Sequence, residues 1–201
     1  SFEDGERLAQ DARLAAIAFT GSRQGGLKLK AAADSVGKPI FLELGSINPV
    51  VVLPGALAER GEALAEEFTG SCLMGTGQFC TSPGMLVMQA DARAEAFVEK
   101  TVSGFAEAPS GVLFSEGGRQ GLASAVQTLS KAGAKVLTGG TAVADDARRY
   151  TNTVLRVSGA EFLANSEALQ TEAFGNATLI VVTADQAESA QVLSALEGNL
   201  T

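Results

Sequence analysis

The sequence contains no histidine and no tryptophan, and only two of its 201 residues are cysteines. Without histidine, this chain by itself cannot supply a Ser-His-Asp triad, a Cys-His pair or a histidine-ligated zinc ion. Proton transfer must therefore depend on carboxylates, lysine, cysteine, tyrosine or water. Cys72 and Cys80 are too few for a disulfide framework and their spacing fits no common metal motif, so we expect no metal.

Positive charge is also scarce. Fifteen Lys and Arg residues face 23 Asp and Glu residues, which gives a formal net charge of −8. An acidic surface repels phosphate backbones, and the densest basic group, Lys28 and Lys30, is too small for a patch, so we expect no nucleic-acid partner. No apolar run approaches the roughly 20 residues that span a bilayer, and no signal-peptide pattern is present. We therefore expect no membrane partner, and the two cysteines make a reducing, cytoplasmic setting the default expectation.

Short apolar runs alternate with amphipathic segments along the whole chain, and this alternation predicts an α/β fold with a parallel sheet. The predicted strands are 15–20, 40–44, 50–53, 85–89, 135–137, 154–157 and 179–182. The predicted helices are 3–13, 27–36, 57–74, 92–105, 118–132 and 185–196, and loops are expected at 143–149 and 165–177.

The first two strands and the helix between them form a predicted βαβ unit with a right-handed crossover. Two strands do not make a stable sheet, so this unit is interpreted as the tail of a larger nucleotide-binding sheet. The chain also stops just after its last predicted helix, with no closing element. Both features lead us to expect a fragment of a longer protein.

Cys80 lies in a predicted loop flanked by Gly75, Gly77 and Gly84, where the backbone can come close to a substrate. A free cysteine is mostly protonated at neutral pH, so a nucleophilic role needs activation, which backbone N–H groups can provide while also holding an oxyanion. The alternative is a small buried hydrophobe. The residue alone leaves these two interpretations even, whereas Cys72, on an apolar helix face, is expected to be structural.

Glu43 stands inside an otherwise apolar strand, where burying a charge is costly unless the charge has a use. At the carboxyl end of a strand it would point into the crevice where open α/β sheets bind ligands, and it could serve as a general base. The alternative is an edge residue that faces water or a paired structural carboxylate, and the residue alone favours that alternative.

A second candidate site is the strand-to-helix turn at Gly21 and Ser22, followed by Gly26. Gly21 permits a tight turn, Ser22 can cap the helix, and the amides there can hold phosphate, although the full G-x-G-x-x-G pattern is missing. Glu172 lies in a long predicted loop and, taken alone, reads as a solvated carboxylate.

Four segments resemble, in order, the landmarks of the aldehyde dehydrogenase superfamily, and the resemblance spans the whole chain. They are Phe19-Thr20-Gly21-Ser22, Glu43-Leu44-Gly45, Gly77-Gln78-Phe79-Cys80 and Glu172-Ala173-Phe174-Gly175. The resemblance implies a parallel-sheet α/β catalytic domain over residues 46–201, incomplete at its C-terminus. It also implies that residues 1–45 are the C-terminal end of a Rossmann-like coenzyme-binding domain.

The resemblance further implies NAD(P)-dependent oxidation of an aldehyde to a carboxylate. Cys80 would form a thiohemiacetal and then a thioester, its N–H would form part of the oxyanion hole, and Glu43 would activate the hydrolytic water. The implied cofactor, NAD or NADP, would be bound by two groups of residues. The first group consists of Gly21, Ser22, Gly26 and Leu44, with Ser22 at the pyrophosphate. The second group consists of Glu172 and Phe174, at the nicotinamide ribose.

The sequence departs from the superfamily pattern at three positions. Ser46 and Ile47 replace the usual Gly-Lys after Glu-Leu-Gly, and Asn176 replaces a proline. The Gly-Ser-x-Asn-Pro-Val run and Phe79 resemble 2,5-dioxovalerate (α-ketoglutarate semialdehyde) dehydrogenases and the related fatty-aldehyde enzymes. This subgroup implies a semialdehyde substrate and favours NADP.

Several superfamily segments lie outside these residues, so we expect the isolated 201-residue chain to be inactive and the full-length protein to be a homo-oligomer. Two alternative functions are kept. One is an acylating, coenzyme A-using or other thiol acyl-transfer enzyme, and the other is a non-catalytic nucleotide-binding or scaffold domain in which Cys80 is inert.

Overall fold

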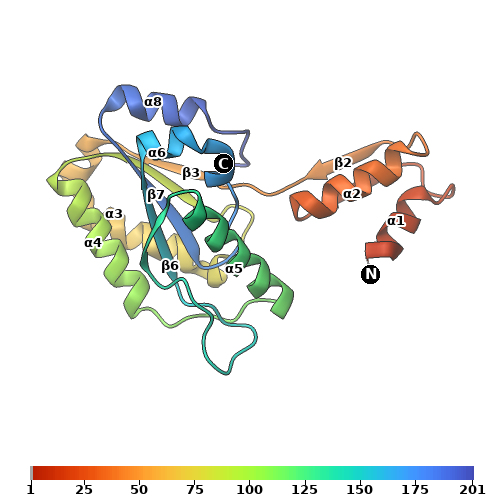
Figure 1. Cartoon of the computed structure of the whole chain (residues 1–201), viewed down its shortest axis with the longest axis horizontal. Coiled ribbons are helices and arrows are strands. Elements are labelled where there is room, and N and C mark those ends of the chain that lie inside the picture. The colour runs from red at the N-terminus through yellow and green to blue at the C-terminus, as the bar shows by residue number, and fades with distance from the viewer. Residues whose placement is uncertain (1) are drawn as a thin grey trace. The chain divides into compact units, whose positions relative to one another are not determined.

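The computed structural model describes residues 2–201 and divides the chain into two compact units, Ser1–Gly45 and Ser46–Thr201 (Figure 1). The boundary coincides with the one expected from the sequence. The assignment of these units to a coenzyme-binding and a catalytic domain stays a prediction.

The N-terminal unit contains the predicted βαβ arrangement. Its elements are α1 (Phe2–Gln10), β1 (Ile17–Thr20), α2 (Arg23–Asp34) and β2 (Ile40–Glu43). Strands β1 and β2 are parallel, with Ile17 opposite Ile40 and Thr20 opposite Glu43, which confirms the parallel pairing. Helix α2 begins at Arg23 rather than at residue 27, because the Ser22 hydroxyl caps it by accepting the Gly25 N–H at 3.2 Å.

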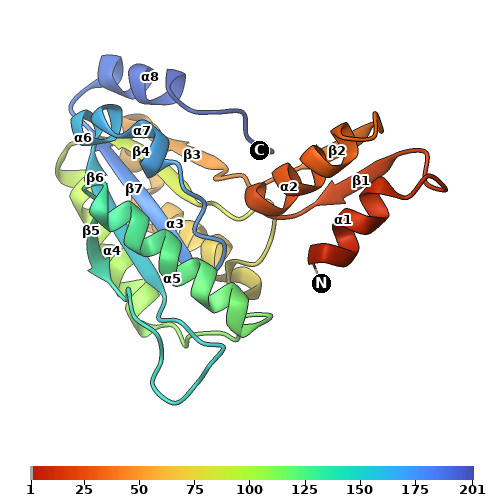
Figure 2. The ribbon, with the colours of Figure 1, turned by 45° about the vertical axis from the view of Figure 1, so that its right-hand side comes forward.

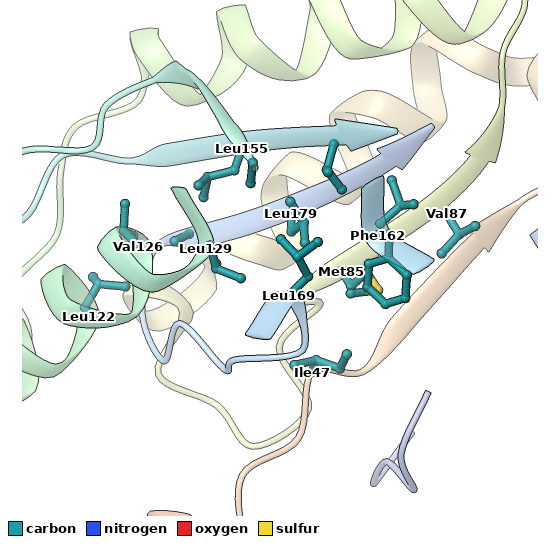
Figure 3. Packing of buried hydrophobic residues seen from close by; sticks show 14 of the residues in the cluster. Ile47, Met85, Val87, Leu122, Val126, Leu129, Leu155, Phe162, Leu169 and Leu179 are labelled. Atoms are coloured by element: carbon teal, nitrogen blue, oxygen red, sulfur yellow. The ribbon is translucent and has the colours of Figure 1, made fainter. Parts of the chain in front are cut away.

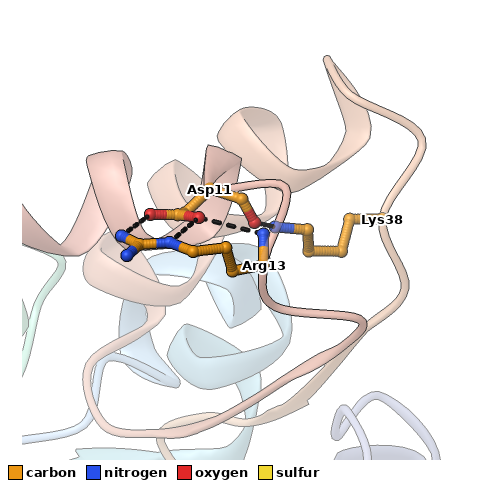
Figure 4. A network of polar contacts seen from close by, with 3 residues as sticks. All are labelled: Asp11, Arg13 and Lys38. Carbon is orange, nitrogen blue, oxygen red and sulfur yellow. Dashed lines mark hydrogen bonds and ion pairs between the residues drawn. The ribbon is translucent and has the colours of Figure 1, made fainter.

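Helix α1 ends at Gln10, earlier than the sequence predicts, and a polar turn follows it. The Asp11 carboxylate accepts hydrogen bonds from the backbone N–H and the guanidinium of Arg13, and the Lys38 ammonium donates to the Asp11 carbonyl at 2.6 Å (Figure 4). The Arg13 guanidinium holds the pKa of Asp11 at about 2. This turn links the end of α1 to the segment that leads into β2.

The C-terminal unit is built on a five-stranded sheet with the order β3-β4-β7-β6-β5. The strands are β3 (Pro49–Val52), β4 (Met85–Gln89), β5 (Lys135–Thr138), β6 (Thr153–Ser158) and β7 (Ala177–Thr183). Strands β3, β4, β7 and β6 are parallel, as expected, whereas β5 pairs antiparallel with β6 at the edge. The β5–β6 connection contains no crossover helix, and an antiparallel pair needs none.

Helices cover both faces of this sheet (Figures 1 and 2). They are α3 (Pro54–Leu73), α4 (Ala92–Glu107), α5 (Glu116–Lys131), α6 (Gly159–Ala164), α7 (Ser166–Leu169) and α8 (Gln186–Ser194), with a 3-10 turn, η1 (Met74–Gly77). The sequence does not predict α6 and α7, and α7 lies within the segment expected to be a loop. The Ser158 and Glu161 side chains start α6 with a capping box, and Leu169 of α7 is buried.

Alternate residues of the strands point into two separate cores. Leu86 and Met88 of β4 face α3 and α4, where they pack with residues such as Phe97. Met85 and Val87 face the other layer, with Phe162 and neighbouring aliphatic side chains (Figure 3). Every residue of β7 is buried, as is typical of a central parallel strand covered on both faces.

Candidate active site

Three loops meet at one edge of the C-terminal sheet. They precede strands β3, β4 and β7 and contain Ser46 to Asn48, Gln78 to Gly84 and Thr171 to Asn176. Since these three strands are parallel neighbours, their amino ends lie at the same edge. The fold therefore gathers two of the predicted motifs, those of Cys80 and Glu172, although open α/β sheets more often bind ligands at the carboxyl ends.

Cys80 is an exposed free cysteine on the loop that follows η1. Its carbonyl oxygen accepts a hydrogen bond from the Asn48 side-chain amide at 2.8 Å, and the same amide nitrogen donates to the Ser82 carbonyl at 2.9 Å. The Ser82 N–H closes a tight turn onto the Phe79 carbonyl at 3.1 Å. The loop is thus held by its backbone while the thiol stays accessible, which a nucleophile requires.

Cys72 has the opposite environment. Its side chain on α3 is 1% exposed, and its thiol lies 3.3 Å from the carbonyl oxygen of Pro83, to which it donates. Burial raises the pKa of this thiol to about 12, so it stays protonated at neutral pH. The structural role expected for Cys72 is confirmed, and the two cysteines are chemically distinct.

The Cys80 loop touches its neighbours through backbone groups. Gly77 adopts a left-handed conformation with φ +66°, and a Cβ atom there would overlap the carbonyl oxygen of Gly175. At the other end of the loop, the Gly84 N–H donates to the Ile47 carbonyl at 2.8 Å, and the Gly84 carbonyl accepts from Leu179 at 3.0 Å. The glycines of the two sequence motifs therefore allow direct contact between their loops.

Glu172 is half-buried beside this contact, where its Oε1 accepts the backbone N–H of Ser46 at 3.2 Å. Burial raises the pKa of the carboxyl group, and the Ser46 hydrogen bond opposes that rise in part. A narrow hollow between the loops is lined in part by Glu172, Phe79 and Phe174. Phe174 is 44% exposed, so it presents an aromatic surface next to the carboxylate.

Two departures from the expected motif pattern have defined partners. The Ser46 hydroxyl donates to Asn48 Oδ1 at 2.6 Å. The Asn176 amide nitrogen donates to the Tyr150 carbonyl at 2.9 Å and to Asn152 Oδ1 at 2.7 Å. Both replacements therefore anchor the loops that carry the candidate residues.

The other predicted site residues form a separate group in the N-terminal unit. Glu43 is at the carboxyl end of β2, as predicted, and the Gly21 N–H donates to its carbonyl oxygen at 3.0 Å. The Glu43 side chain is exposed, and its role as a general base stays a prediction. Gly26 lies under the Leu44 side chain, which leaves no room for a Cβ atom.

Sequence reasoning missed the importance of Asn48 and Asn199. Asn48 is 3% exposed and has φ 44°, a left-handed conformation that asparagine tolerates better than most residues. An Asn-Pro pair directly before a predicted strand was the available signal for Asn48. Asn199 gave no signal, because its partners are far away in the sequence.

An open pocket of about 540 Å³ lies at the opposite, carboxyl edge of the sheet and includes Lys135 and Arg156 among its lining residues. Two helices begin there, and their first N–H groups are already capped by Ser158 and Asp185. We assign this pocket no role in the candidate site, because the candidate residues lie at the amino edge.

Within residues 2–201, no group of three or more histidine, cysteine, aspartate or glutamate side chains is placed to hold a metal ion. In the same described part of the chain, no helix has the length and apolar character needed to cross a membrane.

The chain is similar to known aldehyde-oxidising enzymes. It is 36% identical over 200 residues to alpha-ketoglutaric semialdehyde dehydrogenase 2 of Azospirillum brasilense and 30% identical to alpha-ketoglutaric semialdehyde dehydrogenase of Acinetobacter baylyi. Both alignments cover 98% of this chain and 38% of the relative, so the chain spans under half of these relatives. The crystal structure of an NAD-dependent aldehyde dehydrogenase from Sinorhizobium meliloti superposes with a TM-score of 0.77 at 25% identity, covering 95% of this chain and 38% of that one. The model of the aldehyde dehydrogenase family matches residues 2–197, and the chain therefore belongs to that family.

Proposed function

We propose that the full-length protein carrying this chain oxidises an aldehyde to a carboxylate with NAD or NADP, using Cys80 as the nucleophile. The observation that carries this proposal is the exposed Cys80 thiol on a loop fixed through its carbonyl groups. The loop with Glu172 and Phe174 touches it backbone to backbone. An accessible thiol and a candidate ribose-binding carboxylate are thus on adjacent loops in a chain of the aldehyde dehydrogenase family.

In the proposed reaction, the Cys80 thiolate attacks the aldehyde carbon and forms a thiohemiacetal, whose oxygen is stabilised by the Cys80 backbone N–H. The nicotinamide cofactor, when bound, supplies the acceptor for the hydride. Loss of that hydride from carbon leaves a thioester on Cys80. Glu43 then takes a proton from water as the water attacks the thioester, which releases the carboxylate and restores the Cys80 thiol.

The residues present fit a dinucleotide in two places. Ser22 and Gly21 stand at the start of the 12-residue helix α2, whose N-terminus favours a phosphate group. The Ser46 N–H bonds to only one oxygen of the Glu172 carboxylate, so acceptor capacity is left for ribose hydroxyl groups. We infer that these two sites, with Gly26, Leu44 and Phe174, hold the cofactor.

We propose a semialdehyde that also carries a carboxylate as the substrate class. This rests on the 36% and 30% identity to enzymes named alpha-ketoglutaric semialdehyde dehydrogenases, and on the resemblance of the run from Gly45 to Val50 to that subgroup. The same resemblance favours NADP as the cofactor. We also infer that residues 1–45 end a coenzyme-binding domain and that residues 46–201 form most of a catalytic domain.

The test measures reduced-nicotinamide absorbance with the full-length protein, NAD or NADP and a panel of aldehydes that includes 2,5-dioxovalerate. We expect turnover in the wild type and a loss of about a thousandfold or more in Cys80→Ala. Cys72→Ala serves as the matched control and should retain activity. Absence of turnover with every aldehyde would refute the proposal, and strict dependence on coenzyme A would identify an acylating enzyme instead.

A Glu43→Gln variant tests the proposed base separately. If Glu43 activates the hydrolytic water, the first turnover of hydride release should survive while steady-state turnover falls by about a hundredfold. Equal loss of both phases would contradict this role and assign Glu43 to an earlier step.

A further inference from the structure

Two asparagine side chains connect the Cys80 loop to distant parts of the C-terminal unit. Asn48 precedes β3, and Asn199 follows α8, so the two residues are remote in sequence. Asn199 Oδ1 nevertheless accepts the backbone N–H of Ile47 at 2.9 Å and that of Asn48 at 3.3 Å. The two amides therefore form a series of contacts that ends at Cys80.

Asn48 acts toward the Cys80 loop only as a donor. Its nitrogen gives one hydrogen bond to the Cys80 carbonyl and another to the Ser82 carbonyl, which uses both of its N–H groups. Its oxygen faces the other way and accepts from Ser46 Oγ at 2.6 Å and from the Thr201 N–H at 3.3 Å. The orientation of this amide is therefore fixed by its partners on both sides.

Asn199 acts toward the loop of Asn48 only as an acceptor. The same oxygen that receives the Ile47 and Asn48 N–H groups also lies 3.3 Å from Ser46 Oγ. Its nitrogen points elsewhere and donates to the Glu197 carbonyl at 2.8 Å. A carboxylate at position 199 would keep the contacts to Ile47 and Asn48.

We propose that Asn48 is the positioning residue for Cys80 and that Asn199 holds Asn48 in place. Asn48 fixes the carbonyl of Cys80 itself, so it sets the backbone from which the thiol projects. The left-handed conformation of Asn48 aims its side chain at the loop, and Asn199 secures that conformation by accepting the backbone N–H groups of Ile47 and Asn48. The expected effect on turnover rests on the proposed function, whereas the effect on the loop does not.

Replacing asparagine by aspartate should have different results at positions 48 and 199. Asn48→Asp replaces both donors with an acceptor that faces two carbonyl oxygens, so it should release the loop. Asn199→Asp keeps the acceptor and should leave the loop in place, whereas Asn199→Ala removes the acceptor and should loosen it. Asn48→Gly, which tolerates a positive φ without the amide, controls for the added charge of Asn48→Asp.

The experiment uses the full-length protein and two measurements. Amide hydrogen exchange of the peptide covering residues 78–84 should become about tenfold faster or more in Asn48→Asp, Asn48→Gly and Asn199→Ala, and should be unchanged in Asn199→Asp. Peptides from α4 and β7 should exchange as in the wild type in all four variants. In the loosened variants kcat should fall by about tenfold or more, while KM for the dinucleotide changes by less than about twofold.

Unchanged exchange of residues 78–84 in Asn48→Asp and Asn48→Gly would overturn the proposal. Equal acceleration in α4 and β7 would also overturn it, because that would show general destabilisation. If the exchange pattern appears but the wild type oxidises no aldehyde, the positioning of the loop stands and the proposed dehydrogenase function fails. The two proposals can therefore be judged separately.

Discussion

The backbones of Gly77 and Gly175 lie so close that a Cβ atom on residue 77 would overlap the carbonyl oxygen of residue 175. This contact joins the loop that carries Cys80 to the loop that carries Glu172. Both residues have a positive φ, so glycine is favoured at each of them for its backbone conformation as well.

We expect Gly77→Ala to separate these loops. The methyl group would have to displace backbone at a left-handed position, which should cost about 2 kcal/mol or more of stability and reduce turnover at least about tenfold. Urea unfolding and steady-state kinetics measure the two effects. Gly70→Ala, in α3 with no atom near the added methyl, is the control and should be neutral or stabilising by up to about 1 kcal/mol. Wild-type kinetics in Gly77→Ala would show that the contact is dispensable.

The two cysteines should differ sharply in reactivity. Cys80 is exposed, whereas burial raises the pKa of Cys72 to about 12. Iodoacetamide at pH 7.5 should therefore modify Cys80 and leave Cys72 unmodified until denaturant is added. Peptide mass spectrometry follows both sites in one sample. Modification of Cys72 in the native protein at a rate similar to that of Cys80 would contradict the burial of its thiol.

Glu172 should give cofactor binding a pH dependence. Burial raises its pKa above the ordinary value of 4.5, so as the pH falls it takes up a proton at a higher pH than that value. Because a protonated carboxyl is a weaker acceptor for ribose hydroxyls, KM for the dinucleotide should rise severalfold as the pH is lowered toward 4.5. In Glu172→Gln this rise should be absent. If KM for the dinucleotide rises in Glu172→Gln as it does in the wild type, the pH dependence belongs to another group.

The raised pKa of Glu172 also affects stability. In the folded protein the ionised form is disfavoured, so the unfolded chain loses its proton first and stability declines as the pH rises above 4.5. Glu172→Gln, which keeps an acceptor for the Ser46 N–H, should therefore gain stability at pH 7 and lose this advantage below pH 4.5. Urea unfolding at both pH values measures the gain. An equal gain in stability at both pH values would show that the gain does not come from the ionisation of Glu172.

Phe97 should be a large contributor to the core between α3, α4 and the sheet. It is 2% exposed, and its ring centroid lies 6.1 Å from that of Phe68. Phe97→Ala should cost about 3–5 kcal/mol in the free energy of unfolding because it leaves a cavity. Phe114→Ala, at an 83% exposed side chain, should change stability by less than about 0.5 kcal/mol. Similar losses in both variants would contradict this distinction.

The architecture was largely predictable because apolar runs and glycine breaks carry the α/β signal locally. Strand β4 has the bounds expected from the sequence, and the start of α2 was misplaced because the capping role of Ser22 extends the helix. Helices α6 and α7 are too short to show a helical period. The edge strand β5 is antiparallel because no crossover helix connects it to β6, and the residues of β5 carry no signal of strand direction.

The site was only partly predictable. Motif spacing singled out Cys80 and Glu172, and the sheet brings their loops together. The exposure of Glu43 could not be foreseen, because it depends on which segments pack around the end of β2. The partnership of Asn48 with Asn199 was equally hidden, because no local pattern links residues that meet only after the chain has folded.

The carbonyl groups of the Cys80 loop are held by donors from three separate parts of the fold. Those of Cys80, Ser82, Pro83 and Gly84 all accept hydrogen bonds from Asn48, Cys72 or Leu179. The negative ends of these four peptide dipoles are therefore directed at donors inside the fold. Asn48 holds the carbonyls of Cys80 and Ser82, whereas Cys72 and Leu179 hold those of Pro83 and Gly84, so the two halves of the loop can loosen independently of each other.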